Sequence, residues 1–282
     1  MNGAGEPLLE IRNLVKHFPV KSGVLFSREV DRVRAVDGVD LTVAAGETLG
    51  LVGESGSGKS TLCRAVLQLV EPTSGSVRFE GRELVGLRQR QLRPLRRDMQ
   101  MIFQDPYASL NPRRRVGQIV GGPIKLNGLA SGAELRRQVE ELLDRVGLSP
   151  EHYDRFPHEF SGGQRQRIGI ARAIALKPKL IVADEPVSAL DVSIQAQIVN
   201  LLDDLQDELG LAYVFVAHDI GVVRHISDRI AVMHHGKIVE TGDADQVCEH
   251  PRDDYTKKLL AAVPIPDPRE SRERRRASLG SA

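Results

Sequence analysis

The chain has 282 residues, of which 41% are hydrophobic and 27% charged, and its formal net charge is +1. This balance is typical of a globular protein with one large or two small domains, and it excludes a chain that draws in nucleic acid or an anionic membrane through its overall charge. Aromatic residues make up 4% and Trp is absent, which argues against an aromatic platform for bases. The two cysteines, Cys63 and Cys248, lack the spacing of a metal site and fit a reducing compartment.

The sequence contains no candidate membrane span. Its longest apolar runs are far shorter than the roughly 18 consecutive residues that a spanning helix needs. The first residues lack the basic and then apolar pattern of a secretory signal. We therefore expect a soluble chain that serves a membrane process only by docking onto other subunits.

In chain order, the first third of the sequence predicts strands, a glycine-rich loop and a helix. Strands are expected at residues 8–14, 34–43, 47–52 and 76–80, where short apolar runs are bounded by turn residues. Residues 21–32 separate the first two strands and predict a charged loop or hairpin. Residues 59–70 carry apolar side chains at helical spacing, directly after the glycine-rich loop.

The rest of the chain predicts a helical insertion followed by alternating strands and helices. Residues 82–97 predict a solvated helix or loop, and residues 99–103 a strand. Helices are expected at 116–120, 133–146, 164–176 and 194–208, and strands at 180–183, 212–217 and 230–233. Gly147 is a predicted C-cap. Alternation of this kind favours a parallel α/β core, with the middle helices as an inserted subdomain.

The glycine-rich loop has the G-x-x-x-x-G-K-[ST] pattern of a P-loop. It consists of Gly53, Glu54, Ser55, Gly56, Ser57, Gly58, Lys59 and Ser60, with Thr61 following. Backbone N–H groups of such a loop cradle phosphates, the Lys reaches the β- and γ-phosphates, and the Ser ligates Mg²⁺. A strand before it and a helix after it are the context that this motif requires.

Two acidic residues end the predicted strand at residues 180–183. Asp184 is placed to support the Mg²⁺ shell, and Glu185 beside it to polarise an attacking water as a general base. The alternative is a buried strand that simply ends in a polar turn.

Upstream of this strand, a hydroxyl and two glycines begin a helix at Ser161-Gly162-Gly163-Gln164. A helix start of this kind presents N–H donors and a positive dipole end to an anion. Together with the P-loop and the acidic strand end, the segment resembles the signature of the ATP-binding cassette (ABC) family. The resemblance implies an α/β P-loop NTPase fold with a RecA-like parallel-sheet core, an N-terminal antiparallel β subdomain and a helical subdomain inserted at about 105–170. The cassette would occupy 8–263, and a charged, Pro-rich tail at 264–282 is expected to be disordered.

The resemblance also implies roles for single residues. Gln104 would be the Q-loop residue that touches Mg²⁺ or water, and His218 the switch histidine that contacts the γ-phosphate. Asp191 would lie in the D-loop that crosses a dimer interface, although it also suits the N-cap of a helix near Val192. Phe18 would stack on adenine, or else belong to the core.

These roles define the predicted site. The catalytic residues are Glu185, His218 and Gln104. The ATP-binding residues are Phe18, Gly53, Glu54, Ser55, Gly56, Ser57, Gly58, Lys59, Ser60 and Thr61. The Mg²⁺ ligands are Ser60, Gln104 and Asp184. Ser161, Gly162, Gly163 and Gln164 would act on ATP held by a second cassette packed head-to-tail, so that a monomer would hydrolyse ATP poorly.

Longer segments resemble the dipeptide and oligopeptide importer ATPases, and most of all the second of the two ATPase subunits that such importers usually carry. They begin at His17, Val52, Phe103, His152, Glu185 and Pro251. This resemblance implies ATP-driven import of peptides, with two membrane permeases, a second ATPase (favouring a heterodimer) and a solute-binding protein as partners, at the cytoplasmic face of the inner membrane. Related importers carry glutathione or nickel complexes, so the substrate stays open. Family members often end in clustered cysteines that hold an iron–sulfur centre; no cysteine follows Cys248, so we expect no such cluster in this chain.

Two other classes compete with an importer ATPase. A soluble ABC ATPase of DNA repair has a long coiled coil between the P-loop and the acidic strand, and the interval from Lys59 to Asp184 is short and lacks heptads. A translation-type ATPase has two cassettes in one chain, and this chain has one P-loop. We expect no nucleic-acid partner. A regulatory cassette without turnover is disfavoured because Lys59, Asp184, Glu185 and His218 are all present.

Overall fold

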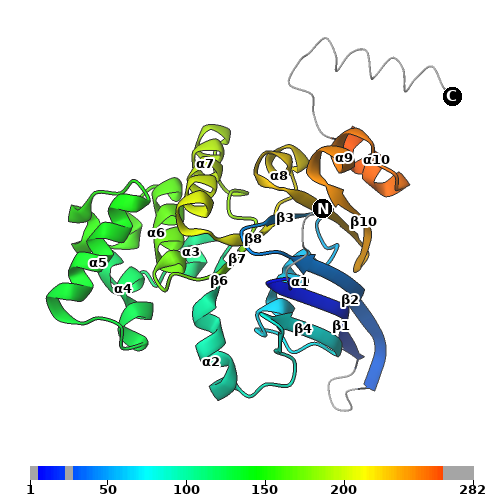
Figure 1. Ribbon diagram of the computed structural model, residues 1–282, viewed down its shortest axis with the longest axis horizontal. Coiled ribbons are helices and arrows are strands. Elements are labelled where there is room, and N and C mark those ends of the chain that lie inside the picture. Colours follow the sequence, from blue (N-terminus) through cyan, green and yellow to red (C-terminus); the bar gives the residue numbers. More distant parts are fainter. Residues whose placement is uncertain (1–5, 23–27, 263–282) are drawn as a thin grey trace, which may run out of the picture.

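The computed structural model describes residues 6–22 and 28–262, which form an antiparallel sheet, a larger mixed sheet and a group of helices (Figure 1). The antiparallel sheet has the strand order β2-β1-β4-β5. Its strands are β1 (Leu9–Ser22), β2 (Arg28–Val43), β4 (Ser74–Phe79) and β5 (Arg82–Glu83). The N-terminal antiparallel subdomain was predicted from the family resemblance, and it is present.

The first two strands are longer than predicted. Their backbones pair from Leu9 opposite Val43 to Ser22 opposite Arg28, with several register shifts on the way. Residues 21–22 and 28–32 therefore belong to the two paired strands, which agrees with the hairpin alternative of the prediction rather than with the loop. Antiparallel pairing uses only backbone groups, so the charged residues of this segment do not prevent it.

The larger sheet has six strands in the order β10-β9-β3-β8-β7-β6. They are β3 (Thr48–Val52), β6 (Met99–Ile102), β7 (Leu180–Asp184), β8 (Ala212–Val216), β9 (Arg229–His234) and β10 (Lys237–Asp243). Strands β6, β7, β8, β3 and β9 are parallel, as the alternating pattern predicts. β10 was not predicted, and it pairs antiparallel to β9 at one edge.

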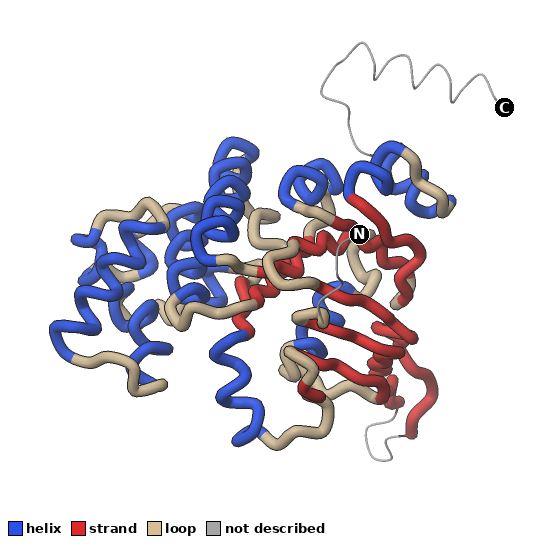
Figure 2. Tube along the Cα trace, viewed as in Figure 1, coloured by secondary structure: helices blue, strands red, loops and turns tan. Residues whose placement is uncertain are grey.

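Helices cover this sheet and extend away from it (Figure 2). Those that follow its strands are α1 (Lys59–Val66), α6 (Gly162–Ile174), α7 (Val192–Leu209), α8 (Ile220–Ile226), α9 (Ala244–Glu249) and α10 (Asp254–Ala261). The helices α3 (Pro106–Ser109), α4 (Val116–Leu126) and α5 (Gly132–Arg145), with 3-10 turns at Pro150–Asp154 and Pro157–Glu159, fall in the interval predicted as an insertion. α1 ends before the predicted residue 70, because Gln68 takes a positive φ of 53°.

The hydrophobic core lies on both faces of the larger sheet. In β7, Leu180 and Val182 pack towards the antiparallel sheet and α1, whereas Ile181 and Ala183 pack towards the helices on the other face. Successive side chains of a strand point to opposite faces, so a strand buried on both faces is a continuous apolar run. This explains why the strand is recognisable from sequence alone.

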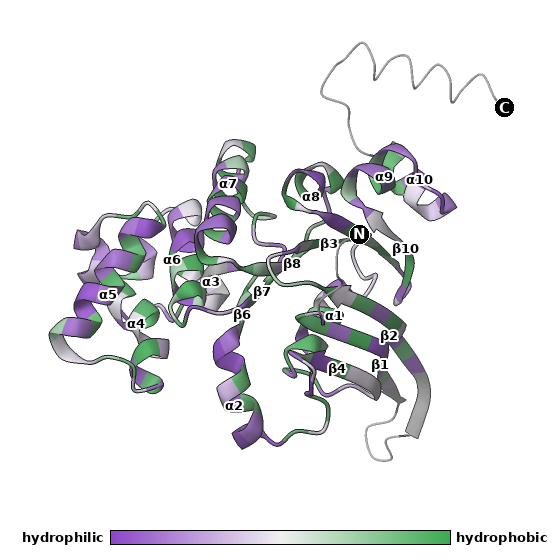
Figure 3. Cartoon of the chain, viewed as in Figure 1, coloured by the Kyte–Doolittle hydropathy of each residue, from purple (hydrophilic) through white to green (hydrophobic). Residues whose placement is uncertain are grey.

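Helix α2 (Gln89–Asp98) is different, because Leu92 is its only buried residue and its surface is largely hydrophilic (Figure 3). This exposure of α2, which also contains Pro94, agrees with the predicted solvated helix or loop at residues 82–97. Among the described residues, no helix is both long enough and apolar enough to cross a membrane.

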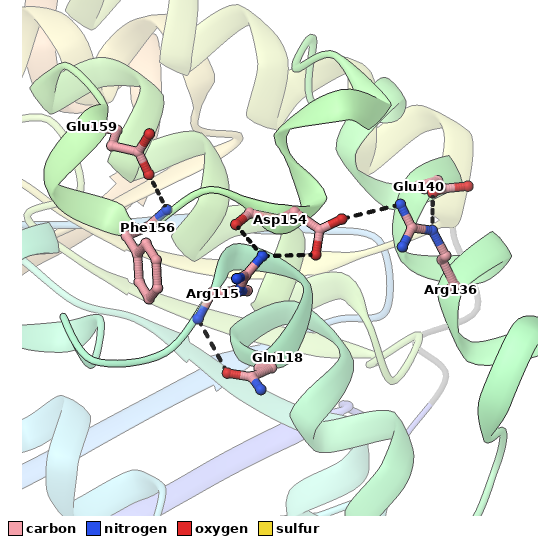
Figure 4. A network of polar contacts seen from close by, with 7 residues as sticks. All are labelled: Arg115, Gln118, Arg136, Glu140, Asp154, Phe156 and Glu159. Atoms are coloured by element: carbon pink, nitrogen blue, oxygen red, sulfur yellow. Dashed lines mark hydrogen bonds and ion pairs between the residues drawn. The ribbon is translucent and has the colours of Figure 1, made fainter.

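Within the helical insertion, Asp154 connects three segments (Figure 4). One carboxylate oxygen accepts from Arg115 Nη1 at 3.2 Å, just before α4, and the other from Arg136 Nη2 of α5 at 3.3 Å. Arg136 also donates to Glu140 at 2.7 Å. These groups are about half exposed, so each ion pair contributes little stability, and the network mainly fixes the turn after α5 against the two helices.

Candidate active site

The glycine-rich loop joins β3 to α1 and is packed tightly against neighbouring backbone. Gly58, the N-cap of α1, has a φ of 110°, and a Cβ there would lie 1.9 Å from the carbonyl oxygen of Ala35. Only glycine fits this position, since it combines a left-handed conformation with a close backbone approach. The predicted strand, loop and helix order of a P-loop is therefore present.

Lys59 begins α1 and turns its ammonium back into the loop. Its Nζ donates to the carbonyl oxygens of Gly53 at 2.7 Å and Glu54 at 2.9 Å. Burial lowers the pKa of Lys59, although the nearby carboxylates of Glu185 and Asp184 oppose that effect. The side chain is thus a buried cation whose charge is balanced by the acidic end of β7.

Ser60 and Asp184 meet at the floor of the site. The Ser60 hydroxyl donates to Asp184 Oδ1 at 2.8 Å. Burial raises the pKa of Asp184, and the hydrogen bond from Ser60 limits the rise. A hydroxyl and a carboxylate are hard oxygen donors of the kind Mg²⁺ prefers, and Mg²⁺ commonly takes few protein ligands beside substrate phosphates. The pair fits the predicted Mg²⁺ site, and the described residues contain no group of three or more His, Cys, Asp or Glu side chains that could hold a metal ion by themselves.

Glu185 follows Asp184 in a left-handed conformation, with a φ of 47°. This turn carries its side chain out of the sheet, where Oε2 accepts from Gln104 Nε2 at 2.7 Å. His218 Nδ1 lies 4.0 Å from the same oxygen. The three predicted catalytic residues, which come from the ends of β6, β7 and β8, are therefore brought together.

A cavity of about 800 Å³ lies above the loop. Its lining contains the predicted residues Phe18, Ser55, Gly56, Gly58, Lys59, Ser60, Thr61, Gln104, Glu185 and His218. Gly53, Glu54, Ser57 and Asp184 do not line it and instead support those that do. Phe18 is 39% exposed, which excludes the core alternative, and Lys16 Nζ lies 4.9 Å from its ring centre.

Sequence reasoning missed four lining residues, Val33, Arg34, Ala35 and His235. The first three come from β2, whose sequence carries no motif. His235 stands in the turn between β9 and β10 with a φ of 46°. The His234-His235-Gly236 sequence could have indicated a tight hairpin there, because Gly and His tolerate that conformation better than branched residues do.

The predicted signature residues lie outside this cavity. Ser161 is the N-cap of α6, and its hydroxyl accepts from the Gln164 amide at 3.3 Å, while the Gln164 side chain accepts from the Ser161 amide at 3.1 Å. Gly162 and Gly163 are the first residues of α6. Asp191 is the N-cap of α7, as predicted, but its side chain makes no capping hydrogen bond.

Comparisons with known proteins agree with this geometry. Residues 36–188 match the family "ABC transporter", and residues 239–281 match "Oligopeptide/dipeptide transporter, C-terminal region". The glutathione import ATP-binding protein GsiA of Salmonella paratyphi A is 56% identical over 271 residues, which cover 96% of this chain but 43% of that protein. The chain thus spans less than half the length of the curated relatives it matches.

Two solved structures resemble the whole arrangement. A dimeric, post-hydrolysis state of the ATP-binding cassette MJ0796, bound to ADP and Pi, has 32% identity and a TM-score of 0.74, covering 84% of this chain and 98% of that one. The cbiO1 protein of Clostridium perfringens, part of the cbiONQ transporter complex, has 26% identity and a TM-score of 0.76, covering 96% and 100%.

Proposed function

Because this chain belongs to the ABC transporter family, we propose that it binds MgATP in the cavity above Gly58 and hydrolyses it to drive import of short peptides. The observation that carries the proposal is the convergence of Lys59, Glu185, Gln104 and His218 on that cavity. The predicted family, its oligopeptide/dipeptide branch and the α/β cassette fold are confirmed by the comparisons.

The chemistry follows from the positions of these side chains. Loop N–H groups and Lys59 bind the phosphates. Ser60 and Asp184 would hold Mg²⁺, whose charge would neutralise that of the phosphates. Glu185 Oε2 accepts a proton from the water that attacks the γ-phosphorus, as the bond to the β–γ bridging oxygen breaks. Gln104, 2.7 Å from Glu185, orients that carboxylate and the water, and His218 contacts the γ-phosphate.

The signature residues act on a second site. Ser161, Gly162 and Gly163 form a helix start outside their own cavity, so they cap the γ-phosphate held by a partner cassette in a head-to-tail dimer. The similarity to a dimeric cassette structure supports this arrangement. Two incomplete sites then become complete only when both chains meet.

Glutathione or another short peptide is the proposed substrate. The match to the oligopeptide/dipeptide transporter C-terminal region and the name of the GsiA relative support peptide chemistry, since glutathione is a tripeptide. The partners would be a second ATPase, two membrane permeases and a solute-binding protein, with this chain at the cytoplasmic face of the inner membrane. The predicted tail at 264–282 lies outside the described residues.

Affinity purification of the tagged chain from its native membrane tests the proposal. Recovery of multi-span membrane proteins, a second ATPase and a solute-binding protein supports the importer function, and the ligand of the binding protein identifies the substrate. Recovery of ribosomes or nucleic acid without any membrane subunit contradicts import. Phosphate release that requires Lys59 tests the ATPase activity separately.

A further inference from the structure

The last helix in the described part of the chain contacts the P-loop from outside the cavity. Tyr255, on α10, accepts a hydrogen bond through its hydroxyl from the Glu54 amide at 3.0 Å. The two residues are separated by 201 positions in the sequence. Tyr255 is not among the residues that line the cavity, so it contacts the loop without occupying the space available to a nucleotide.

The peptide group that Tyr255 contacts is the one that Lys59 holds from the other side. The carbonyl oxygen of Gly53 and the N–H of Glu54 belong to a single peptide plane, and a trans peptide directs them in opposite directions. Lys59 Nζ donates to that carbonyl at 2.7 Å, and Tyr255 accepts from that N–H. The plane is therefore held at both ends, next to a glycine, the residue type that restrains its own backbone least.

The position of Tyr255 is itself fixed by β10. Glu240, only 8% exposed, accepts from the amides of Arg252 at 2.9 Å and Asp253 at 3.1 Å with its two carboxylate oxygens. Asp253 then caps α10 by accepting from the Tyr255 amide at 2.8 Å. Glu240 therefore sets where α10 begins and, through it, where the tyrosine ring lies.

The end of β9 and the turn that follows it also support Tyr255 and the P-loop. The His234 ring stacks on the Tyr255 ring with centres 3.7 Å apart and planes at 15°. Two residues later, the Gly236 amide donates to the Ser57 carbonyl of the P-loop at 2.9 Å. The region after β8 thus holds the loop at two points, Glu54 and Ser57.

We propose that Tyr255 is a positioning residue of the nucleotide site, which holds the Gly53–Glu54 peptide so that the P-loop and Lys59 are arranged for phosphate before ATP arrives. This inference rests on the proposed function of the cavity. Pre-organisation of a binding loop strengthens binding because less ordering remains to be done when the ligand enters. Tyr255 therefore acts on ATP binding rather than on hydrolysis, since its hydrogen bonds and ring stacking involve Glu54, Asp253 and His234 rather than the catalytic residues.

Tyr255→Phe removes the hydroxyl and keeps the ring that stacks on His234. Calorimetric titration of the purified full chain should show MgATP binding weakened roughly twofold to tenfold, the range that corresponds to one lost hydrogen bond. At saturating MgATP, kcat should change less than twofold, so the effect appears in KM alone. Tyr213→Phe is the matched control, because its buried hydroxyl has no hydrogen-bond partner among the described residues and lies in the core of β8.

A double-variant cycle separates positioning from general stability. Glu240→Ala should also weaken MgATP binding, but it should have little further effect when Tyr255 is already Phe, because both changes act through one contact. Unchanged binding by folded Tyr255→Phe would overturn the inference, as would equal effects of Glu240→Ala in both backgrounds. Where Glu240→Ala does not fold, the Tyr255→Phe result decides. If wild type binds no MgATP, or Lys59→Ala binds it normally, the proposed function itself fails.

Discussion

Replacement of Glu185 by Gln tests the chemical centre of the site most directly. The amide keeps the size of the carboxylate and still offers an oxygen to Gln104 Nε2, which lies 2.7 Å from Oε2 in the wild type. It cannot accept a proton at neutral pH. The left-handed conformation of this position, with a φ of 47°, is tolerated equally by both side chains, so the fold should be unaffected.

The expected loss follows from the role of a general base. Positioned bases contribute about 10²–10⁴ in rate, which corresponds to roughly 3–5 kcal/mol of barrier. Binding of MgATP should be unchanged or stronger, because one negative charge beside the triphosphate is removed. We therefore expect kcat to fall by at least about a hundredfold while the Kd for MgATP does not rise.

Steady-state phosphate release from the assembled transporter in membranes, together with nucleotide titration, measures both quantities. Glu80→Gln is the matched control, since Glu80 also has a positive φ, of 49°, and pairs with Lys179 outside the cavity. It should keep wild-type kcat. A Glu185→Gln variant with more than a tenth of wild-type kcat would refute the assignment of Glu185 as the base.

Three further predictions concern other parts of the molecule. Ser161→Ala should leave MgATP binding by the isolated chain unchanged, because Ser161 lies outside its own cavity. It should lower phosphate release by the assembled dimer by about 10²–10³, the loss that follows removal of one donor to developing negative charge. Equal losses in both assays would contradict action on a partner site. In α4, Gly117→Ala should lower the free energy of unfolding by about 1–3 kcal/mol, since the added Cβ would lie 2.4 Å from the Tyr153 ring. Gly122→Ala adds a Cβ with no atom within 4 Å and should raise the free energy of unfolding by about 0.5–1 kcal/mol. Denaturant titration of both variants distinguishes the two effects. Burial alone would raise the pKa of Glu240, but the amides of Arg252 and Asp253 hold that pKa below its usual 4.5. The carboxylate therefore stabilises the fold above pH 4.5 and loses this effect as the pH falls through the lower pKa of the folded state. The difference in unfolding free energy between wild type and Glu240→Gln should accordingly shrink below pH 4.5 and stay constant at neutral pH.

Much of the fold could be predicted because its signals are local. β7 is an apolar run buried on both faces, and the glycine-rich loop needs residue types that only a close backbone approach explains. The grouping of Gln104, Glu185 and His218 could be anticipated from the family resemblance, and the structure brings them together because parallel strands end at the same edge of a sheet.

The remainder depends on contacts between distant residues. β10 and α10 were not predicted, because both are short and half exposed, and they are held by Glu240 and by packing against β9. At residues 28–32 the sequence left a loop or a hairpin open, because charged residues are compatible with both, and the backbone pairing with β1 decides for the hairpin. Tyr255 lies in the segment from Pro251 that resembles the importer ATPases, but that resemblance assigned it no role, and its hydrogen bond to Glu54 does.

The pairing of β3 has a consequence for the time at which the protein becomes active during synthesis. β3 leads into the P-loop near the beginning of the chain, yet both of its neighbours, β8 and β9, are made more than 150 residues later. Tyr255 follows Glu54 by 201 residues. At about 5–20 residues per second, a ribosome needs on the order of 10–40 s to cover that interval. For most of that interval the emerging phosphate loop lacks both flanking strands, and until Tyr255 is made it also lacks its outer support. The growing chain therefore stays unable to hold ATP until this region has been synthesised.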